Sequence, residues 1–235
     1  MTDEKKYGHG LISDYDRAIR LDPNDYEAYC RRGQNYIRVR EYRNAIASFD
    51  EAIRLNPSFA RAHMVRGYAY EELGDFQQAI KDYNEGVRLD PSCAESYRCR
   101  GVYFKERGDF KGAIADFSEA LGLVPNYKKS VLVNRGVSYV EIGDYDSAIA
   151  DFNNAELSSW DTEGYLYRGI AYRNKGDYDA AIADFSRVLE QTEEIKERAS
   201  AYFNQGATHI AFLAAILSLV RPSPATKLWP QLLHL

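Results

Sequence analysis

The residue types that most often carry chemistry, histidine, cysteine and the carboxylates, are present in this chain without the spacing of a catalytic or metal site. The four histidines lie far apart, with no HExxH arrangement and no pair four residues apart. They are His9, His63, His209 and His234. Neither a GxxxxGK[ST] loop nor a GxGxxG turn after a strand occurs, which argues against nucleotide binding. We therefore expect no enzyme activity, no catalytic residue, no cofactor and no small-molecule substrate.

The cysteines predict reduced thiols rather than a disulfide framework or a metal site. Cys30, Cys93 and Cys99 are odd in number and contain no CxxC pair. No further cysteine or histidine stands at the spacing that zinc sites use. The first ten residues, MTDEKKYGHG, lack the apolar stretch of a signal peptide. We expect a cytoplasmic protein without a bound metal.

Charge and composition narrow the class of partner. The formal net charge is −5, whereas a protein that coats nucleic-acid phosphates needs an excess of lysine and arginine. Apolar residues make up 45% of the chain and charged residues 28%, enough for a sizeable core. The aspartates and glutamates recur periodically, which favours caps and solvated faces over acid/base pairs. We expect no nucleic-acid partner.

The elements that carry these residues follow a strict repeat. Pro23, Pro57, Pro91 and Pro125 are each 34 residues apart. Glycines keep the same period, with steps of 34, 34, 35 and 33. They are Gly33, Gly67, Gly101, Gly136 and Gly169. A period in this range indicates stacked supersecondary units.

Each unit is predicted to be a pair of helices. Large and small residues recur at steps of three and four, which places them on one helix face. A Gly-Asp pair divides most units, because glycine takes the left-handed geometry that ends a helix and aspartate caps the next one. These pairs are Gly74-Asp75, Gly108-Asp109, Gly143-Asp144 and Gly176-Asp177. The periodic glycines such as Gly33 would let the two helices approach closely.

This pattern resembles the tetratricopeptide repeat over about residues 11–206. The resemblance implies an all-α fold, a right-handed superhelical solenoid of stacked antiparallel helix–turn–helix hairpins. Residues 1–25 would form a partial repeat containing a second helix only, and residues 26–195 five full repeats. These repeats are 26–59, 60–93, 94–127, 129–161 and 162–195. Residues 196–220 would form a C-terminal helix, partial repeat or cap, and residues 221–235 an irregular tail.

One departure from the family predicts an ion-pair ladder. The family usually has leucine before the first signature glycine, but this chain has Arg32, Arg66, Arg100, Arg135 and Arg168. Aspartate recurs one residue before the aromatic of the second helix, at Asp82, Asp116, Asp151 and Asp184, with Ser48 in the remaining unit. We expect each arginine to pair with its aspartate inside the stack.

The C-terminal end departs from the pattern. The segment ASAYFNQGATH begins another first helix, and then the signature stops. Residues 210–220, IAFLAAILSLV, are apolar on all sides. Four interpretations remain open: a capping helix, a self-association surface, a membrane anchor, and an altered terminus. Eleven apolar residues are short of the ~20 needed to span a bilayer, so a membrane partner is not expected.

The resemblance places the binding surface on the inner wall formed by the first helices. By this argument the peptide-binding residues are Gln34, Arg38, Met64, Tyr68, Glu72, Arg98, Val102, Lys105, Val133, Val137, Val140, Leu166, Ile170 and Arg173. The wider wall also includes Glu27, Cys30, Arg61 and Glu95. The rear half reads as a continuous exposed apolar strip from Val133 to Ile170. The lysine, asparagine and arginine clamp that some family members use for acidic chaperone tails is not reproduced.

These observations predict a non-enzymatic scaffold or adaptor. It would bind a peptide or helix of a partner protein in the groove, with register set by rim charges such as Arg98, Lys105 and Arg173. An alternative from another class is an architectural subunit that self-associates through its apolar C-terminal helix, residues 210–220.

Overall fold

The structure, a computed structural model, describes residues 3–124, 128–158, 161–191 and 204–210, and every regular element in these ranges is an α-helix. This confirms the predicted all-α class. The chain divides into two compact units, Met1–Asn134 and Arg135–Leu235, called here unit 1 and unit 2.

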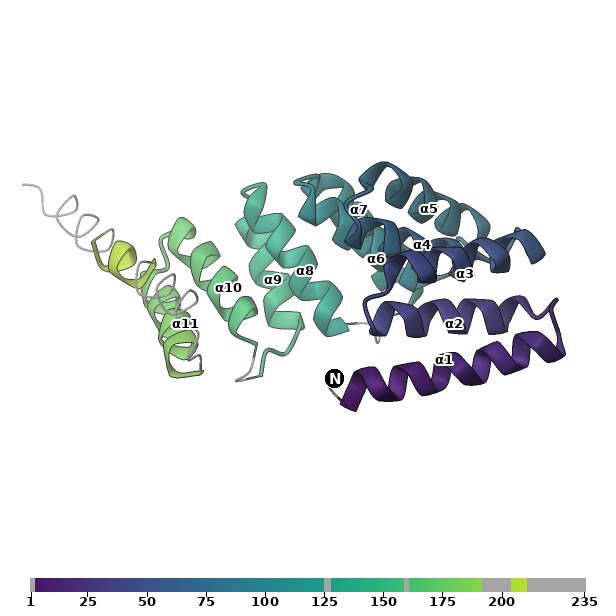
Figure 1. The fold of residues 1–235 in the computed structure, drawn as a ribbon. Helices are drawn as coiled ribbons and strands as arrows, with labels where there is room; N and C mark the ends of the chain where they lie inside the picture. The colour runs from purple at the N-terminus through teal and green to yellow at the C-terminus, as the bar shows by residue number, and fades with distance from the viewer. Residues whose placement is uncertain (1–2, 125–127, 159–160, 192–203, 211–235) are drawn as a thin grey trace, which may run out of the picture. The chain divides into compact units, whose positions relative to one another are not determined.

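Unit 1 is built from a single helix followed by three hairpins. The single helix is α1 (Asp3–Leu21). The hairpins pair α2 (Tyr26–Arg38) with α3 (Tyr42–Leu55), α4 (Ala60–Glu72) with α5 (Phe76–Leu89), and α6 (Ala94–Glu106) with α7 (Phe110–Leu123). Successive helices lie side by side, with α1 against α2 (Figure 1). The single helix α1 begins at Asp3, before residue 11, where the resemblance to the repeat begins.

Unit 2 continues the same construction. The boundary between the units falls inside α8 (Lys128–Glu141), which is followed by α9 (Tyr145–Asn154). Helix α10 (Thr162–Lys175) packs on α9 and forms a hairpin with α11 (Tyr178–Gln191). Residues 204–210 are helical. The apolar segment 211–220, for which four interpretations were open, lies outside the described residues, and none of the described helices is long and apolar enough to cross a membrane.

The turn inside each hairpin forms as the Gly-Asp pairs predict. Gly74, Gly108, Gly143 and Gly176 have φ between 79° and 85°, a left-handed conformation that glycine adopts without strain. The following aspartate accepts a hydrogen bond from the backbone N–H three residues later, as Asp75 does from Gln78 at 3.2 Å. The first hairpin differs, because Arg40 has φ 62° and Glu41 makes no side-chain cap bond.

The core of each hairpin is an aromatic ring pressed against a glycine. Phe49, Phe117, Phe152 and Phe185 are fully buried. A Cβ atom added at Gly101 would lie 2.8 Å from the Phe117 ring, closer than real contacts allow. The same holds for the other glycine–phenylalanine pairs, at 2.5–2.9 Å. The predicted close approach of the two helices is therefore confirmed, and it requires the absence of a side chain at these positions.

The predicted arginine–aspartate ladder is present. Arg66, Arg100, Arg135 and Arg168 each donate two hydrogen bonds of 2.7–2.8 Å to the aspartate 16 residues later. Those aspartates are 2–7% exposed, and each bidentate pair satisfies two carboxylate oxygens. In the first hairpin, where serine replaces the aspartate, Arg32 Nε donates to Ser48 Oγ at 3.1 Å.

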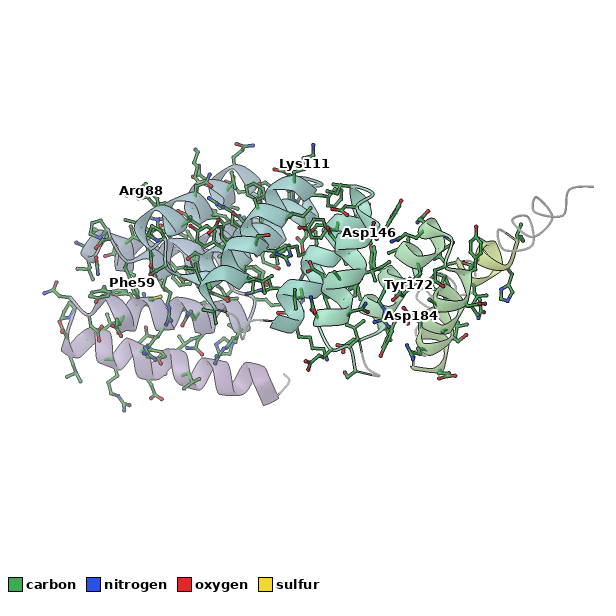
Figure 2. All side chains as sticks on the ribbon, turned by 180° about the vertical axis from the view of Figure 1, so that it is seen from behind. Phe59, Arg88, Lys111, Asp146, Tyr172 and Asp184 are labelled. Atoms are coloured by element: carbon green, nitrogen blue, oxygen red, sulfur yellow. The ribbon has the colours of Figure 1, made fainter. Side chains whose placement is uncertain are left out.

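The ladder also joins neighbouring hairpins, which the sequence pattern did not predict. The Nη1 atoms of four of these arginines donate to a polar side chain on the preceding second helix. The pairs are Arg32 with Asp16 at 2.9 Å, Arg66 with Asp50 at 2.6 Å, Arg100 with Asn84 at 2.9 Å and Arg168 with Asn153 at 2.8 Å. Aromatic rings flank the guanidinium groups, as Tyr165 and Tyr172 flank Arg168 at 5.3 and 6.0 Å. Tyr172 and Asp184, the ion-pair partner of Arg168, are labelled in Figure 2.

Candidate functional site

A cavity of about 870 Å³ opens in unit 1, on the face formed by the first helices of its three hairpins. Helix α2 contributes Glu27, Cys30, Arg31 and Gln34, and α4 contributes Ala60, Arg61, Met64 and Val65. The connections before α4 and α6 add Ser58, Phe59, Asp90 and Cys93, the last residue of α5 adds Leu89, and α6 adds Glu95. We call this the front cavity. Its size is in the range of pockets that hold small ligands or a peptide side chain and its neighbours.

The front cavity has apolar side chains in its floor and charged side chains at its border. Cys30 and Met64 are buried, at 2% and 9% exposure, and Phe59 is half-buried. Tyr26 packs edge-on against the Phe59 ring at 5.0 Å, which fixes that wall (Phe59 is labelled in Figure 2). Such a surface can hold an apolar side chain while the border holds a polar one.

The cations at the border differ in how well they are paired. Arg31 lies 3.9 Å from Glu27, an exposed and weak pair. The nearby Arg98 is bound to Glu95, by bonds of 2.8 and 2.5 Å. Arg61 is exposed and has no ion pair or side-chain hydrogen bond with the part of the chain that the structure describes. An incoming carboxylate would therefore find Arg61 without displacing another partner.

Two thiols of unit 1, Cys30 at the front cavity and Cys99 outside it, do not point to nucleophilic or metal chemistry. Burial raises the pKa of Cys30 to about 11, and the Arg61 and Arg31 guanidinium groups only partly oppose this. Burial likewise raises the pKa of Cys99 to about 12. Protonated thiols are poor nucleophiles and poor metal ligands. Among the described residues, no three histidine, cysteine or acidic side chains are grouped to hold a metal.

The histidines in the described residues lie outside the front cavity. His63 is buried beside the ladder, with Nδ1 3.3 Å from Asp82 Oδ1 and Nε2 3.3 Å from the Pro57 carbonyl. His9 is 3.9 Å from Glu41, and His209 contacts the Gln205 carbonyl at 2.9 Å. Each has a local structural partner, and none of them lines the front cavity.

The fourteen predicted binding residues are only partly brought together. Gln34 and Met64 line the front cavity, together with Glu27, Cys30, Arg61 and Glu95 of the wider predicted wall. The other predicted binding residues do not line it. The structure thus places part of the predicted wall around a cavity, while binding at any of these residues stays a prediction.

The three predicted rim charges already have partners. Lys105 Nζ donates to Asn134 Oδ1 at 2.6 Å, and Arg173 Nη1 donates to Asn204 Oδ1 at 2.6 Å. Arg98 is held by Glu95. A ligand that bound these groups would first have to break or share those bonds.

Two further predicted binding residues, Tyr68 and Glu72, lie on α4 and interact with tyrosine or carboxylate neighbours. Tyr42 donates a 2.8 Å hydrogen bond to Glu72. Burial and the Glu72 carboxylate raise the pKa of Tyr68 to about 12, and Tyr68 remains 41% exposed. Arg38 is exposed on α2, and Val102 is half-buried on α6. Arg38, Tyr68 and Glu72 are therefore exposed and accessible to a ligand, whereas Val102 is only partly so.

The expectation of an open apolar strip in the rear half is wrong at two positions. Val137 and Val140 are 5% and 9% exposed, so they contribute to packing and leave little surface. Leu166 packs with Tyr165 and Val188, and Ile170 and Val133 are half-buried. The sequence periodicity could not distinguish a groove position from one covered by a neighbouring helix.

Sequence reasoning missed the loop residues of the front cavity. Phe59 and Cys93 stand two residues after Pro57 and Pro91, at the position where the first hairpin has the capping residue Asp25. Neither Phe59 nor Cys93 makes a side-chain cap bond. The sequence could have indicated these residues, because Phe59 and Cys93 replace the capping residue found at the equivalent position, Asp25.

Comparison with known families identifies the repeat. The tetratricopeptide repeat pattern matches residues 30–92, 70–128, 133–195 and 166–224, well over half of the chain. The chain belongs to the tetratricopeptide repeat family. This confirms the resemblance drawn from the glycine and proline periods, and the fold is an all-α helical repeat solenoid. The comparison with curated proteins gives no match.

Solved tetratricopeptide structures share the fold at low sequence identity. YrrB, described as having an unusual peptide-binding site, is 18% identical with a TM-score of 0.67, over 80% of this chain and 97% of its own. PilF of Pseudomonas aeruginosa is 17% identical with a TM-score of 0.65, over 84% and 93%. Yeast Tom70 is 19% identical with a TM-score of 0.63, over 90% of this chain and 44% of its own. At these identities the likeness establishes the fold.

Proposed function

We propose that this tetratricopeptide protein is a non-enzymatic interaction scaffold that binds a partner peptide in the front cavity of unit 1. The observation that carries the proposal is a cavity of about 870 Å³ formed by the first helices and the connections between hairpins. Family membership supports a protein-interaction role, and YrrB provides a structural neighbour described as peptide-binding.

The lining defines the chemistry of the peptide. Phe59 offers a half-buried apolar surface, backed by the buried Cys30 and Met64, and this surface accepts an aliphatic side chain because burying it there removes apolar area from water. Arg61, the exposed border cation, favours an acidic side chain near the aliphatic one. We therefore propose a peptide with an acidic residue beside an aliphatic residue. The basic clamp for acidic chaperone tails is a different device, since its positions hold Cys30, Gln34, Met64 and Tyr68.

Selection from a random peptide library on the immobilised protein tests this proposal. We expect the enriched peptides to share an Asp or Glu within a few residues of Leu, Ile, Val or Met. A selected peptide is then labelled, and its Kd is measured by fluorescence polarisation. Arg61→Glu should weaken binding by about tenfold or more, equivalent to about 1.4 kcal/mol. Phe59→Lys should weaken it similarly, because it replaces half-buried apolar surface of the cavity wall with a charge.

Arg43→Glu is the matched control. Arg43 is exposed on the second helix α3 and does not line the front cavity, so the same charge reversal there should change the Kd by less than about twofold. Peptides without a shared acidic residue, or equal losses in Arg61→Glu and Arg43→Glu, would contradict the proposal.

A further inference from the structure

The first helix α4 carries a row of side chains along the face that opens on the front cavity. Arg61, Met64 and Val65 line the cavity at the N-terminal end of α4. Tyr68 and Glu72 follow Arg61 by seven and eleven residues, which places both within about 20° of Arg61 around the helix axis. The row therefore continues from the front cavity to the C-terminal end of α4.

The two charged residues of this row are exposed and lie at its opposite ends. Arg61 is in the first turn of α4, and Glu72 is the last residue of the helix. At a rise of 1.5 Å per residue, the eleven steps between them span about 16 Å. Glu72 accepts a 2.8 Å hydrogen bond from the neutral Tyr42 hydroxyl, and within the described residues neither Arg61 nor Glu72 has an ion pair. Both charges can therefore act on a ligand.

The surface between and beside these charges is apolar or aromatic at one end and negative at the other. Val65 is half-buried and Tyr68 is 41% exposed. Burial, and then the carboxylates of Glu72 and Glu71, raise the pKa of Tyr68 to about 12. Glu106, exposed on α6, is a further carboxylate that acts on Glu71. An aromatic ring beside carboxylates attracts a cation, through both the ring face and the negative charges.

Two cations lie at the same end of the first helices as Tyr68. Arg38 stands 34 residues before Glu72, on α2, and Arg107 ends α6, where its guanidinium stacks on the Phe76 ring at 3.6 Å. In the part of the chain that the structure describes, no guanidinium or ammonium group lies over the Tyr68 ring. The exposed face of this ring is therefore available to a cation from a ligand.

The corresponding positions of the neighbouring first helices carry other charges. On α2 the order is reversed, with Glu27 at the front cavity and Arg38 at the far end. On α6 both positions are acidic, Glu95 and Glu106. Glu27 also lies 3.9 Å from Arg31, which partly compensates its charge. Among α2, α4 and α6, a cation at the cavity followed by a carboxylate at the far end is thus found on α4 alone.

We propose that the peptide bound in the front cavity carries two opposite charges: its acidic residue binds Arg61, and a lysine or arginine about five residues away binds over Tyr68 beside Glu72. An extended chain rises about 3.3 Å per residue, so five residues cover the distance of about 16 Å between the two charges. This inference rests on the proposed function and adds to it a basic residue, a spacing and a direction along α4. A helical peptide would need about eleven residues for the same distance.

A second peptide selection tests the spacing. The acidic and aliphatic residues of a peptide that binds the front cavity are kept constant, and twelve residues on each side are randomised. We expect Lys or Arg to be enriched on one side only, four to six residues from the acid. Absence of a shared basic residue, or a basic residue about eleven positions away, would overturn the inference and leave the acidic and aliphatic preference of the proposed function intact.

Reciprocal charge reversal, measured as peptide Kd by fluorescence polarisation, tests the contact with Glu72. Glu72→Lys should weaken binding of the selected peptide about five- to tenfold, because it turns an attraction into a repulsion. Changing the basic residue of the peptide to Glu should weaken binding to the wild type similarly. The changed peptide should bind Glu72→Lys more tightly than it binds the wild type. Glu119→Lys is the matched control, since Glu119 is exposed on the second helix α7, and it should change either Kd by less than about twofold.

Two milder variants separate the charge from the ring. Glu72→Gln keeps an acceptor for the Tyr42 hydroxyl but removes the charge, and Tyr68→Leu removes the aromatic face; each should weaken binding about threefold. Melting temperatures close to that of the wild type show that the fold is kept at these exposed positions. If Arg61→Glu weakens binding and the Glu72 variants do not, only this inference is rejected. If Arg61→Glu has no effect, the proposed function is rejected with it.

Discussion

At the scale of single residues, the glycines facing the phenylalanine rings are the most restricted positions. Gly101→Ala places a Cβ 2.8 Å from the Phe117 ring, and overpacking of this kind costs about 1–3 kcal/mol. Gly122→Ala, with no atom within 4 Å on the same hairpin, should instead raise the unfolding free energy by about 0.5 kcal/mol. Urea unfolding measures the change in unfolding free energy for both variants. Two changes of the same sign would contradict the role given to the glycine–phenylalanine contact.

Arg40 and Glu41 mark the one turn among the described hairpins of unit 1 that lacks the Gly-Asp pair. A non-glycine residue at φ 62° is strained by about 1 kcal/mol or more, and Glu41 leaves the first turn of α3 without a side-chain cap. The double change Arg40→Gly, Glu41→Asp should therefore raise the unfolding free energy by about 1–2 kcal/mol. Thermal and urea unfolding measure it, and no gain would mean that other contacts of these residues matter more.

At the scale of elements, the ladder joins the helices. Arg100 holds Asp116 within its hairpin and Asn84 on the preceding second helix. Arg100→Met would leave a buried carboxylate unpaired, a loss of about 3 kcal/mol or more in unfolding free energy. Arg100 does not line the front cavity, so peptide Kd should stay within about twofold of wild type at a temperature where both are folded. Lost affinity without lost stability would refute a structural role for the ladder.

The ladder also sets a dependence of stability on pH. Burial alone would raise the pKa of Asp82, but hydrogen bonds from Arg66 and His63 outweigh it and lower the pKa. The contribution of the ionised Asp82 carboxylate to the unfolding free energy is fully present above the unfolded aspartate pKa of about 3.9. It is lost as the pH falls through the lower pKa of the folded state. The stability gap between wild type and Arg66→Met should therefore be widest near neutral pH and narrow below about pH 4. Urea unfolding across this range tests it; a constant gap would be the contrary result.

At the scale of the whole molecule, unit 1 contains the complete front cavity. Val131 of α8 packs with Ala113, Phe117 and Ala120, and Lys105 bonds to Asn134, so the unit needs the first half of α8. A fragment of residues 1–141 should fold cooperatively and bind the selected peptide within about twofold of the full chain. A fragment ending at residue 124 should unfold at lower urea concentration, because the α6–α7 core would lose its cover. Equal stability of the two fragments would contradict this.

The sequence predicted correctly the features that depend on contacts within one repeat, and it failed where a residue contacts a neighbouring hairpin or a connection. The glycine period, the Gly-Asp turns and the Arg–Asp partners are local or repeat-bound features, and all three were predicted correctly. Val137 and Val140 were misassigned as exposed because first-helix positions on the groove and those under a neighbour have similar spacing. The front cavity needed Phe59 and Cys93 from connections between hairpins, and repeat signatures contain no information about such residues.

The equal offsets of the ladder have a consequence for how such arrays change length. Arg66 and Arg100 each reach forward 16 residues and backward 16 residues to equivalent positions. Deleting or duplicating one 34-residue unit would therefore bring an arginine opposite a polar side chain of the same kind at the new junction. Gain or loss of a repeat during evolution would leave no buried guanidinium without a partner, so array length can vary without redesign of the interior.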